Sequence, residues 1–212
     1  SRLAYDATRL SEERAEALAR RLGILAAHFD EEATPLTELP LLSADERQRI
    51  LYDWNGTECD YERTACVHDL IERQVDRTPG ATALCFGDRS LTYREMDERA
   101  NRIAHALIAR GVGPDVLVGL HLPRSPDLVI GALAIQKAGG AYVPLDPDFP
   151  ADRLAFMVKD SGAKIVLTER SHAGFAALSG VDTLCIEDVL ASERRIGRPA
   201  TAAAAENLAS VI

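Results

Sequence analysis

Residues 134–168, AIQKAGGAYVPLDPDFPADRLAFMVKDSGAKIVLT, contain the pattern that decides the fold. An apolar helix ends at Gly139-Gly140, and the short apolar strand AYVPL follows it. A proline-rich loop then leads into a second helix and the strand KIVLT. Strands separated by a helix of this length are typical of right-handed crossovers between parallel strands. The stretch therefore predicts α/β layering.

The same alternation of helices and strands extends over residues 64–212. Before the central stretch it includes a helix after Thr64, the hairpin strands ATALCF and SLTY, a helix after Thr92 and the buried strand VLVGLHL. After it come a short helix over 171–179, the strand TLCI and a polar, alanine-rich stretch over 191–206. We predict an α/β fold with a partial, open, doubly wound, mostly parallel sheet. Ligands of such sheets bind beyond the carboxyl ends of the strands, so the loops after VLVGLHL and AYVPL are the expected place for a site.

Three helix starts are marked by residues that can cap them. Ser43 with Glu46, and Thr92 with Glu95, form S/T-x-x-E capping boxes. Ser125 is predicted to cap a third helix, which is nearly all apolar. Helical periodicity also predicts two inward faces, formed by Val67, Leu70, Ile71 and Val75 after Thr64, and by Met96, Ala100, Ile103, Ala104 and Leu107 after Thr92.

An α-helical arm and a linker precede the α/β region. A helix from Ser11 to about Phe29 has one apolar stripe, formed by Ala15, Leu18, Leu22, Leu25 and Phe29. The extended connector DEEATPLTELPLL and a short helix from Ser43 to Trp54 follow. The chain opens on Ser1 and closes on ENLASVI, so we expect both ends to be cut. The predicted divisions are residues 1–32, 33–62 and 63–212.

Composition excludes several classes of protein. The chain has 24 Lys and Arg against 33 Asp and Glu, a net charge of −9, which argues against binding to nucleic acid or to an anionic membrane. No stretch has the length of a transmembrane helix and no secretory signal is present, so we predict a cytoplasmic protein. The four cysteines show no C-x-x-C spacing and are predicted to be free thiols.

The candidate chemical residues are better explained as scaffold. Gly139-Gly140 follows a helix and leads into a strand, whereas a phosphate cradle leads into a helix. Asp146 and Asp148 flank a proline and are interpreted as turn residues, with a catalytic or Mg²⁺-binding pair as the alternative. The five histidines are scattered without metal-site spacing, and no G-x-S-x-G motif is present: His28, His68, His105, His121 and His172.

Three stretches resemble nonribosomal peptide synthetases. GDRSLTYREMDERANRIAHAL (87–107) and the central stretch (134–168) are similar to the first two core motifs of their amino-acid adenylation domains, members of the adenylate-forming superfamily. LSADERQRILYDWNGTECDY (42–61) is similar to the junction that follows a condensation domain, and the sequence from Ser1 resembles the end of a condensation domain. The resemblance covers essentially the whole chain. It implies that 1–32 is a condensation-domain tail, 33–62 a linker, and 63–212 the N-terminal part of an adenylation core.

The resemblance also implies a parent enzyme. That enzyme would activate an amino acid with ATP and Mg²⁺ and load it on the phosphopantetheine of a carrier domain, with the neighbouring condensation and carrier domains as partners. In the family the phosphate loop, the amino-acid pocket and the catalytic lysine come later than Ile212, and the condensation histidine comes before Ser1. We therefore predict no catalytic, cofactor-binding or metal-binding residue here and expect the segment alone to be inactive. The alternatives are an interdomain docking element over residues 1–62 and part of an acyl-CoA ligase relative.

Overall fold

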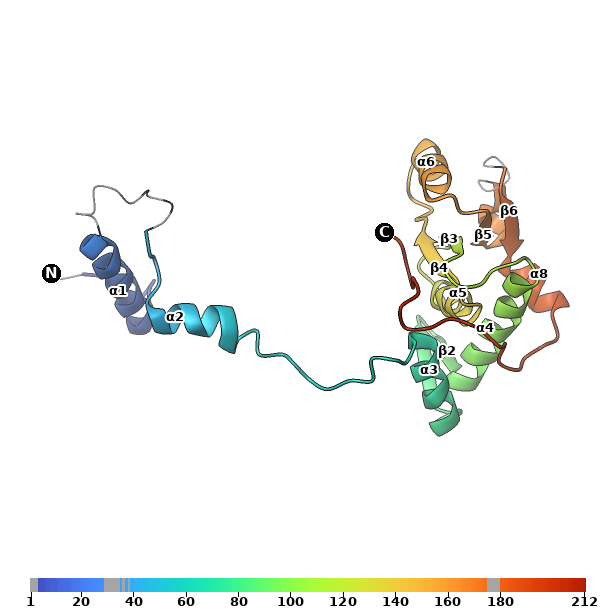
Figure 1. The fold of residues 1–212 in the computed structure, drawn as a ribbon, viewed down its shortest axis with the longest axis horizontal. Helices are drawn as coiled ribbons and strands as arrows, with labels where there is room; N and C mark the ends of the chain where they lie inside the picture. The colour runs from blue at the N-terminus through green and yellow to red at the C-terminus, as the bar shows by residue number, and fades with distance from the viewer. Residues whose placement is uncertain (1–3, 29–34, 36, 38, 175–179) are drawn as a thin grey trace. The chain divides into compact units, whose positions relative to one another are not determined.

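The computed structural model describes residues 4–28, 35, 37, 39–174 and 180–212. The chain divides into two compact units, a first unit over Ser1–Tyr61 and a second unit over Glu62–Ile212. Both are drawn in Figure 1.

The first unit consists of helices. Helix α1 spans Glu12–His28, and Phe29 of the predicted stripe lies outside the described residues. Helix α2 spans Ala44–Gln48 and continues into a π-helical turn, η2, over Arg49–Asp53. The predicted capping box is confirmed, because the Glu46 N–H donates to Ser43 Oγ at 3.2 Å and the Ser43 N–H donates to Glu46 Oε2 at 3.2 Å.

The second unit is built on a parallel sheet. Its strands are β3 (Leu117–His121), β4 (Ala141–Pro144), β5 (Ile165–Thr168) and β6 (Asp182–Cys185), in the order β4-β3-β5-β6. Ser210 forms a further parallel bridge to Tyr142 beyond the β4 edge. The predicted α/β fold with an open, parallel sheet is confirmed. Because the chain reverses direction across the sheet after β4, the switch point lies between β3 and β5.

Helices cover both faces of this sheet, as Figure 1 shows. Helices α4 (Tyr93–Ile108), α5 (Pro126–Lys137) and α8 (Ile186–Ser192) share the larger core with one face. Helix α6 (Ala151–Ser161) packs on the other face. Strand β5 is buried on both sides, since Ile165 and Leu167 enter the larger core and Val166 enters the smaller one. This alternation explains why its sequence is continuously apolar.

Helix α3 (Val67–Arg77) and the hairpin of β1 (Thr82–Phe86) and β2 (Arg89–Thr92) complete the second unit. The inward face predicted for α3 is wrong in part. The exposed fractions of Val67 and Leu70 are 54% and 49%, whereas His68 is only 5% exposed. The inward face predicted for α4 is confirmed, because all five of its residues are buried.

Two further predictions need correction near the end of the chain. The strand TLCI ends at Cys185, and Ile186 begins helix α8, which the periodicity of the sequence does not predict. The predicted helix over 171–179 falls partly outside the described residues, and its described start is a 3₁₀ turn, η3, over Arg170–His172. Separately, no helix within the described ranges has the length and apolarity that crossing a membrane requires.

The N-cap hydroxyls of Thr92 and Ser125 in the second unit differ in what they bind. Thr92 Oγ1 accepts the Glu95 N–H at 3.2 Å. Ser125 Oγ is buried and makes no hydrogen bond with any residue that the structure describes, so the predicted Ser125 side-chain cap is wrong. We expect Thr92→Ala to lower the free energy of unfolding by about 1 kcal/mol. Ser125→Ala should change it by less than about 0.5 kcal/mol.

Urea unfolding followed by circular dichroism measures both variants under the same conditions. Equal losses of unfolding free energy for the two variants would contradict the conclusion that the Thr92 hydroxyl caps its helix and the Ser125 hydroxyl does not. A larger loss for Ser125→Ala would contradict it as well.

Candidate functional site

The switch point between β3 and β5 is where a doubly wound sheet opens to a ligand. His121 and Thr168 end the two strands and are direct partners in the parallel register. A recess of about 270 Å³ lies beside them. It is lined by His121, Pro147, Phe149, Ala151, Leu154, Ser171, His172 and Gly174. The predicted location, after VLVGLHL and AYVPL, therefore contains a recess.

Two histidines that are far apart in the sequence meet in this recess. The rings of His121 and His172 stand edge to face with their centroids 5.8 Å apart. His121 Nδ1 donates to the carbonyl oxygen of Leu145 at 2.8 Å. Burial lowers the pKa of His121 more than this hydrogen bond raises it, so the ring is neutral at neutral pH. The interpretation of the histidines as scattered missed this pair, although His121 ends β3 and His172 follows the carboxyl end of β5.

A serine and a glutamate accompany His172 without forming a catalytic relay. Ser171 Oγ lies 2.9 Å from His172 Nδ1, and Glu169 Oε1 lies 2.9 Å from the same nitrogen. In a nucleophile-base-acid triad the serine and the carboxylate use opposite ring nitrogens. Here they share one nitrogen, so the cluster holds the loop after β5 and does not activate Ser171.

The two aspartates considered as a catalytic pair are turn residues in the structure. Asp146 Oδ1 accepts the Asp148 N–H at 2.9 Å, which is the geometry of an Asx turn. Both residues are exposed. Neither belongs to a group of three potential metal-binding side chains within the described part of the chain.

The glycine pair ends α5 and forms no phosphate cradle. Gly139 has φ = +89°, the left-handed conformation that commonly ends a helix. Its N–H donates to Gln136 O at 2.9 Å, and the Gly140 N–H donates to Ile135 O at 2.9 Å. Both N–H groups are thus used within the fold, which supports the scaffold interpretation.

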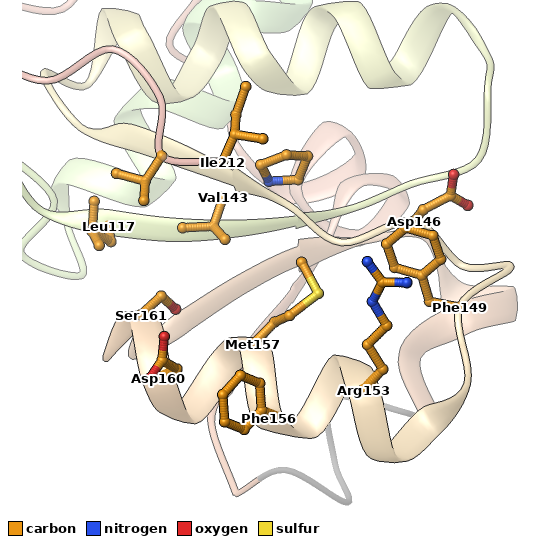
Figure 2. A pocket seen from close by; sticks show the side chains of 12 residues that line it. Leu117, Val143, Asp146, Phe149, Arg153, Phe156, Met157, Asp160, Ser161 and Ile212 are labelled. Atoms are coloured by element: carbon orange, nitrogen blue, oxygen red, sulfur yellow. The ribbon is translucent and has the colours of Figure 1, made fainter.

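A larger recess of about 690 Å³ lies between α6 and the β4 edge (Figure 2). Its apolar walls include Leu117, Val143 and Met157. Arg153 lies on its rim with its guanidinium 4.1 Å from the centre of the Phe149 ring, a cation–π contact. The lining contains no histidine, cysteine or lysine. Its polar side chains include Asp146, Asp160 and Ser161, and the Ser161 hydroxyl donates to the carbonyl oxygen of Val158 at 3.2 Å. This recess can bind an apolar group.

The pair Gly139-Gly140 and Asp146 do not fit the phosphates of ATP and their Mg²⁺. The N–H groups of Gly139 and Gly140 are already used, and Asp146 is tied into a turn. A phosphate cradle needs unpaired N–H groups at a helix start, and Mg²⁺ needs carboxylates beside those phosphates. We therefore assign no catalytic step to the residues that the structure describes.

Residues 71–209 match the sequence profile of the family described as "AMP-binding enzyme". The chain belongs to this family. The match covers α4, both core motifs and all four parallel strands, so the AMP-binding family accounts for most of the second unit. It leaves the first unit unassigned.

Relatives that this chain matches are large synthetases. A linear gramicidin synthase polypeptide of Brevibacillus parabrevis is 40% identical over 215 residues, which cover 100% of this chain and 3% of that protein. Tyrocidine synthase 3 of the same organism is 48% identical over 134 residues, covering 63% of this chain and 2% of that protein. The chain thus spans only a small part of the length of the relatives it matches.

Solved structures support the same relationship. The α-methyl-L-serine-AMP-bound form of the nonribosomal peptide synthetase FmoA3 has a TM-score of 0.71 and 25% identity, covering 98% of this chain and 24% of that one. VinN in complex with 3-methylaspartate has a TM-score of 0.65 at 22% identity, covers 71% of this chain and 44% of that one, and shows the fold alone. The resemblance to the N-terminal part of a synthetase adenylation domain is confirmed.

Proposed function

We propose that this chain is part of a cytoplasmic nonribosomal peptide synthetase module that activates an amino acid with ATP and Mg²⁺. The activated amino acid would then pass to the phosphopantetheine thiol of a carrier domain. The carrying observation is the AMP-binding family match over 71–209, on a doubly wound sheet. Support also comes from the linear gramicidin synthase relative, whose similarity extends over the whole chain.

In this proposal the second unit acts as scaffold. Its glycine pair, its capping box at Thr92 and its buried strands position the carboxyl edge of the sheet. Electrostatic stabilisation of the reacting phosphate requires donors that are aimed at it. The described residues offer no such set, so these donors must come from other residues of the synthetase.

Exchange of pyrophosphate into ATP tests this division of labour. We expect the purified 212-residue chain to show no amino-acid-dependent exchange, because its glycine N–H groups and Asp146 are already engaged. A longer protein that includes this chain and its encoded neighbours should exchange with at least one amino acid. Exchange by the 212-residue chain would contradict the scaffold role. Absence of exchange by the longer protein across all proteinogenic and common non-proteinogenic amino acids would overturn the proposed function.

We propose that residues 1–32 are the tail of a condensation domain, 33–62 the linker and 63–212 the adenylation part. The observation that favours this division is the apolar face of α1. Leu18 and Leu22 are 46% and 48% exposed, and they line a groove of about 440 Å³ within the first unit. Exposed leucines on one helix face fit burial against a neighbouring domain.

The substitution Leu22→Asp, made in the longer synthetase, separates docking of the apolar face of α1 from catalysis. We expect it to reduce peptide-bond formation at least tenfold while amino-acid-dependent exchange stays within twofold, because α1 lies outside the adenylation part. Ala27→Asp is the matched control, since Ala27 is exposed on the opposite face of the same helix. Equal effects of the two variants would contradict the docking role of the apolar face.

A further inference from the structure

The start of α3 brings a thiol, an imidazole and a carboxylate together. Cys66 is the N-cap residue of this helix, and His68 and Asp69 lie in its first turn. One potential ligand atom from each side chain lies within 4.8 Å of the other two. The cluster lies outside the switch-point recess and takes no part in the proposed function.

Local hydrogen bonds orient two of these groups. Asp69 Oδ2 accepts the Cys66 N–H at 2.9 Å, which fixes the carboxylate against the helix start. The other oxygen, Oδ1, lies 3.6 Å from His68 Nε2. The carboxylate therefore presents one oxygen toward the imidazole.

His68 supplies the independent observation that points to a ligand. Its side chain is only 6% exposed, and Nε2 is buried without a hydrogen-bond partner among the described residues. A buried polar nitrogen without a partner is costly, so native proteins rarely leave one. Neutral imidazole is the form that binds a metal cation.

The space beside the cluster admits a small ligand. A cavity of about 130 Å³ is lined by Cys66 and His68 together with Gln136 and Asn207. It exceeds the roughly 30 Å³ share of one water in the liquid. Three protein donors and one water would give the four-coordinate arrangement of an open zinc site.

We propose that Cys66, His68 and Asp69 bind a divalent transition-metal cation of the zinc type. Sulfur, imidazole nitrogen and carboxylate oxygen together suit Zn²⁺, whereas Mg²⁺ and Ca²⁺ take oxygen donors. Metal–donor bonds of about 2.0 to 2.3 Å place tetrahedral donors about 3.5 Å apart. The donor atoms, which lie within 4.8 Å of one another, would therefore move closer by about 1.3 Å at most.

Binding exchanges a proton for the metal. The ordinary pKa of a cysteine thiol is about 8.5, so the metal-free Cys66 side chain carries its proton at neutral pH. When the cation binds, the S–H bond breaks, the proton leaves to solvent and the sulfur bonds the metal. The cation then offsets the thiolate and the Asp69 carboxylate, which makes the bound cluster neutral overall.

Co²⁺ is the probe, because it takes zinc-type sites and reports a bound thiolate by a near-ultraviolet charge-transfer absorption. Metal-free 212-residue chain should bind one equivalent of Co²⁺ with this absorption, and one equivalent of Zn²⁺ should abolish it. Cys66→Ser should remove the absorption and weaken Zn²⁺ binding at least tenfold. Serine is a good N-cap residue, so this variant keeps the start of α3 intact.

Cys185→Ser is the matched control. Cys185 is also a partly buried N-cap residue of a helix, α8, with the acidic residues Glu187 and Asp188 close to its thiol. This variant should retain the Co²⁺ absorption and its stoichiometry. Absence of the thiolate absorption in the unaltered chain would overturn the proposal. Its retention in Cys66→Ser, or its loss in Cys185→Ser, would overturn it equally.

Discussion

Replacement of Lys137 by methionine is expected to lower the free energy of unfolding by about 3–5 kcal/mol. The Lys137 side chain is 0% exposed and forms ion pairs with Glu72 of α3 and with Asp97 of α4. Nζ lies 2.8 Å from Asp97 Oδ1, which accepts no hydrogen bond from any described residue and so depends on the ammonium charge. Methionine fills the space but leaves the mostly buried Asp97 without its cation, whereas Glu72 keeps its ion pair with Arg198, whose Nε lies 3.4 Å from Glu72 Oε2.

Urea unfolding monitored by circular dichroism measures this loss. Lys159→Met is the control, because Lys159 is exposed on α6, and it should change stability by less than about 0.5 kcal/mol. Adding Asp97→Asn to Lys137→Met should restore part of the loss, since it removes the carboxylate charge that Lys137→Met leaves unpaired. If Lys137→Met lowered the free energy of unfolding by less than about 1 kcal/mol, the buried carboxylates would not depend on the Lys137 ammonium.

Gly140→Ala is expected to cost about 2–3 kcal/mol, at the upper end of the range for overpacked sites. A Cβ at this position would lie 2.7 Å from Val112 Cγ1 and 2.9 Å from the carbonyl oxygen of Val116. That oxygen accepts the Ala141 N–H at 2.9 Å, at the start of the β3–β4 pairing. The backbone therefore cannot move away without loss of this hydrogen bond.

Gly113→Ala is the matched control for this substitution. A Cβ on Gly113 meets nothing within 4 Å, and its φ is not positive. Alanine there should leave the midpoint of thermal unfolding unchanged or raise it slightly, because it reduces the freedom of the unfolded chain. Similar midpoints for the two variants would contradict the close approach at Gly140.

Much of the second unit could be predicted because its signals are local. A capping box joins residues three apart, so Thr92 and Glu95 mark the start of α4 whatever surrounds them. The buried face of α4 follows from its spacing for the same reason. Helix α8 was missed because it is only seven residues long and directly follows a strand.

The face of α3 could not be predicted from spacing alone. Its apolar residues allow more than one buried stripe, and contacts with α4 and α5 select the one that includes His68 and Val75. Val67 and Leu70 stay exposed as a result. The thiol–imidazole–carboxylate cluster at the start of this helix depends on that choice.

The location of the candidate site could be predicted from the sequence, but the contacts within it could not. The sequence located the loops at the carboxyl ends of the strands, because strands that alternate with crossover helices are parallel and end at one edge. It did not reveal that His121 and His172 meet, since their contact depends on β3 lying beside β5.

The sequence by itself determined the α/β class, most of the helix starts and the family, because these depend on residues that are near one another along the chain. Only the tertiary structure decided the strand order β4-β3-β5-β6, the pairing of Lys137 with Glu72 and Asp97, and the burial of His68. The physical reason is that helix periodicity and capping act within a few residues. Strand order and buried charge pairs instead depend on which distant surfaces exclude water together.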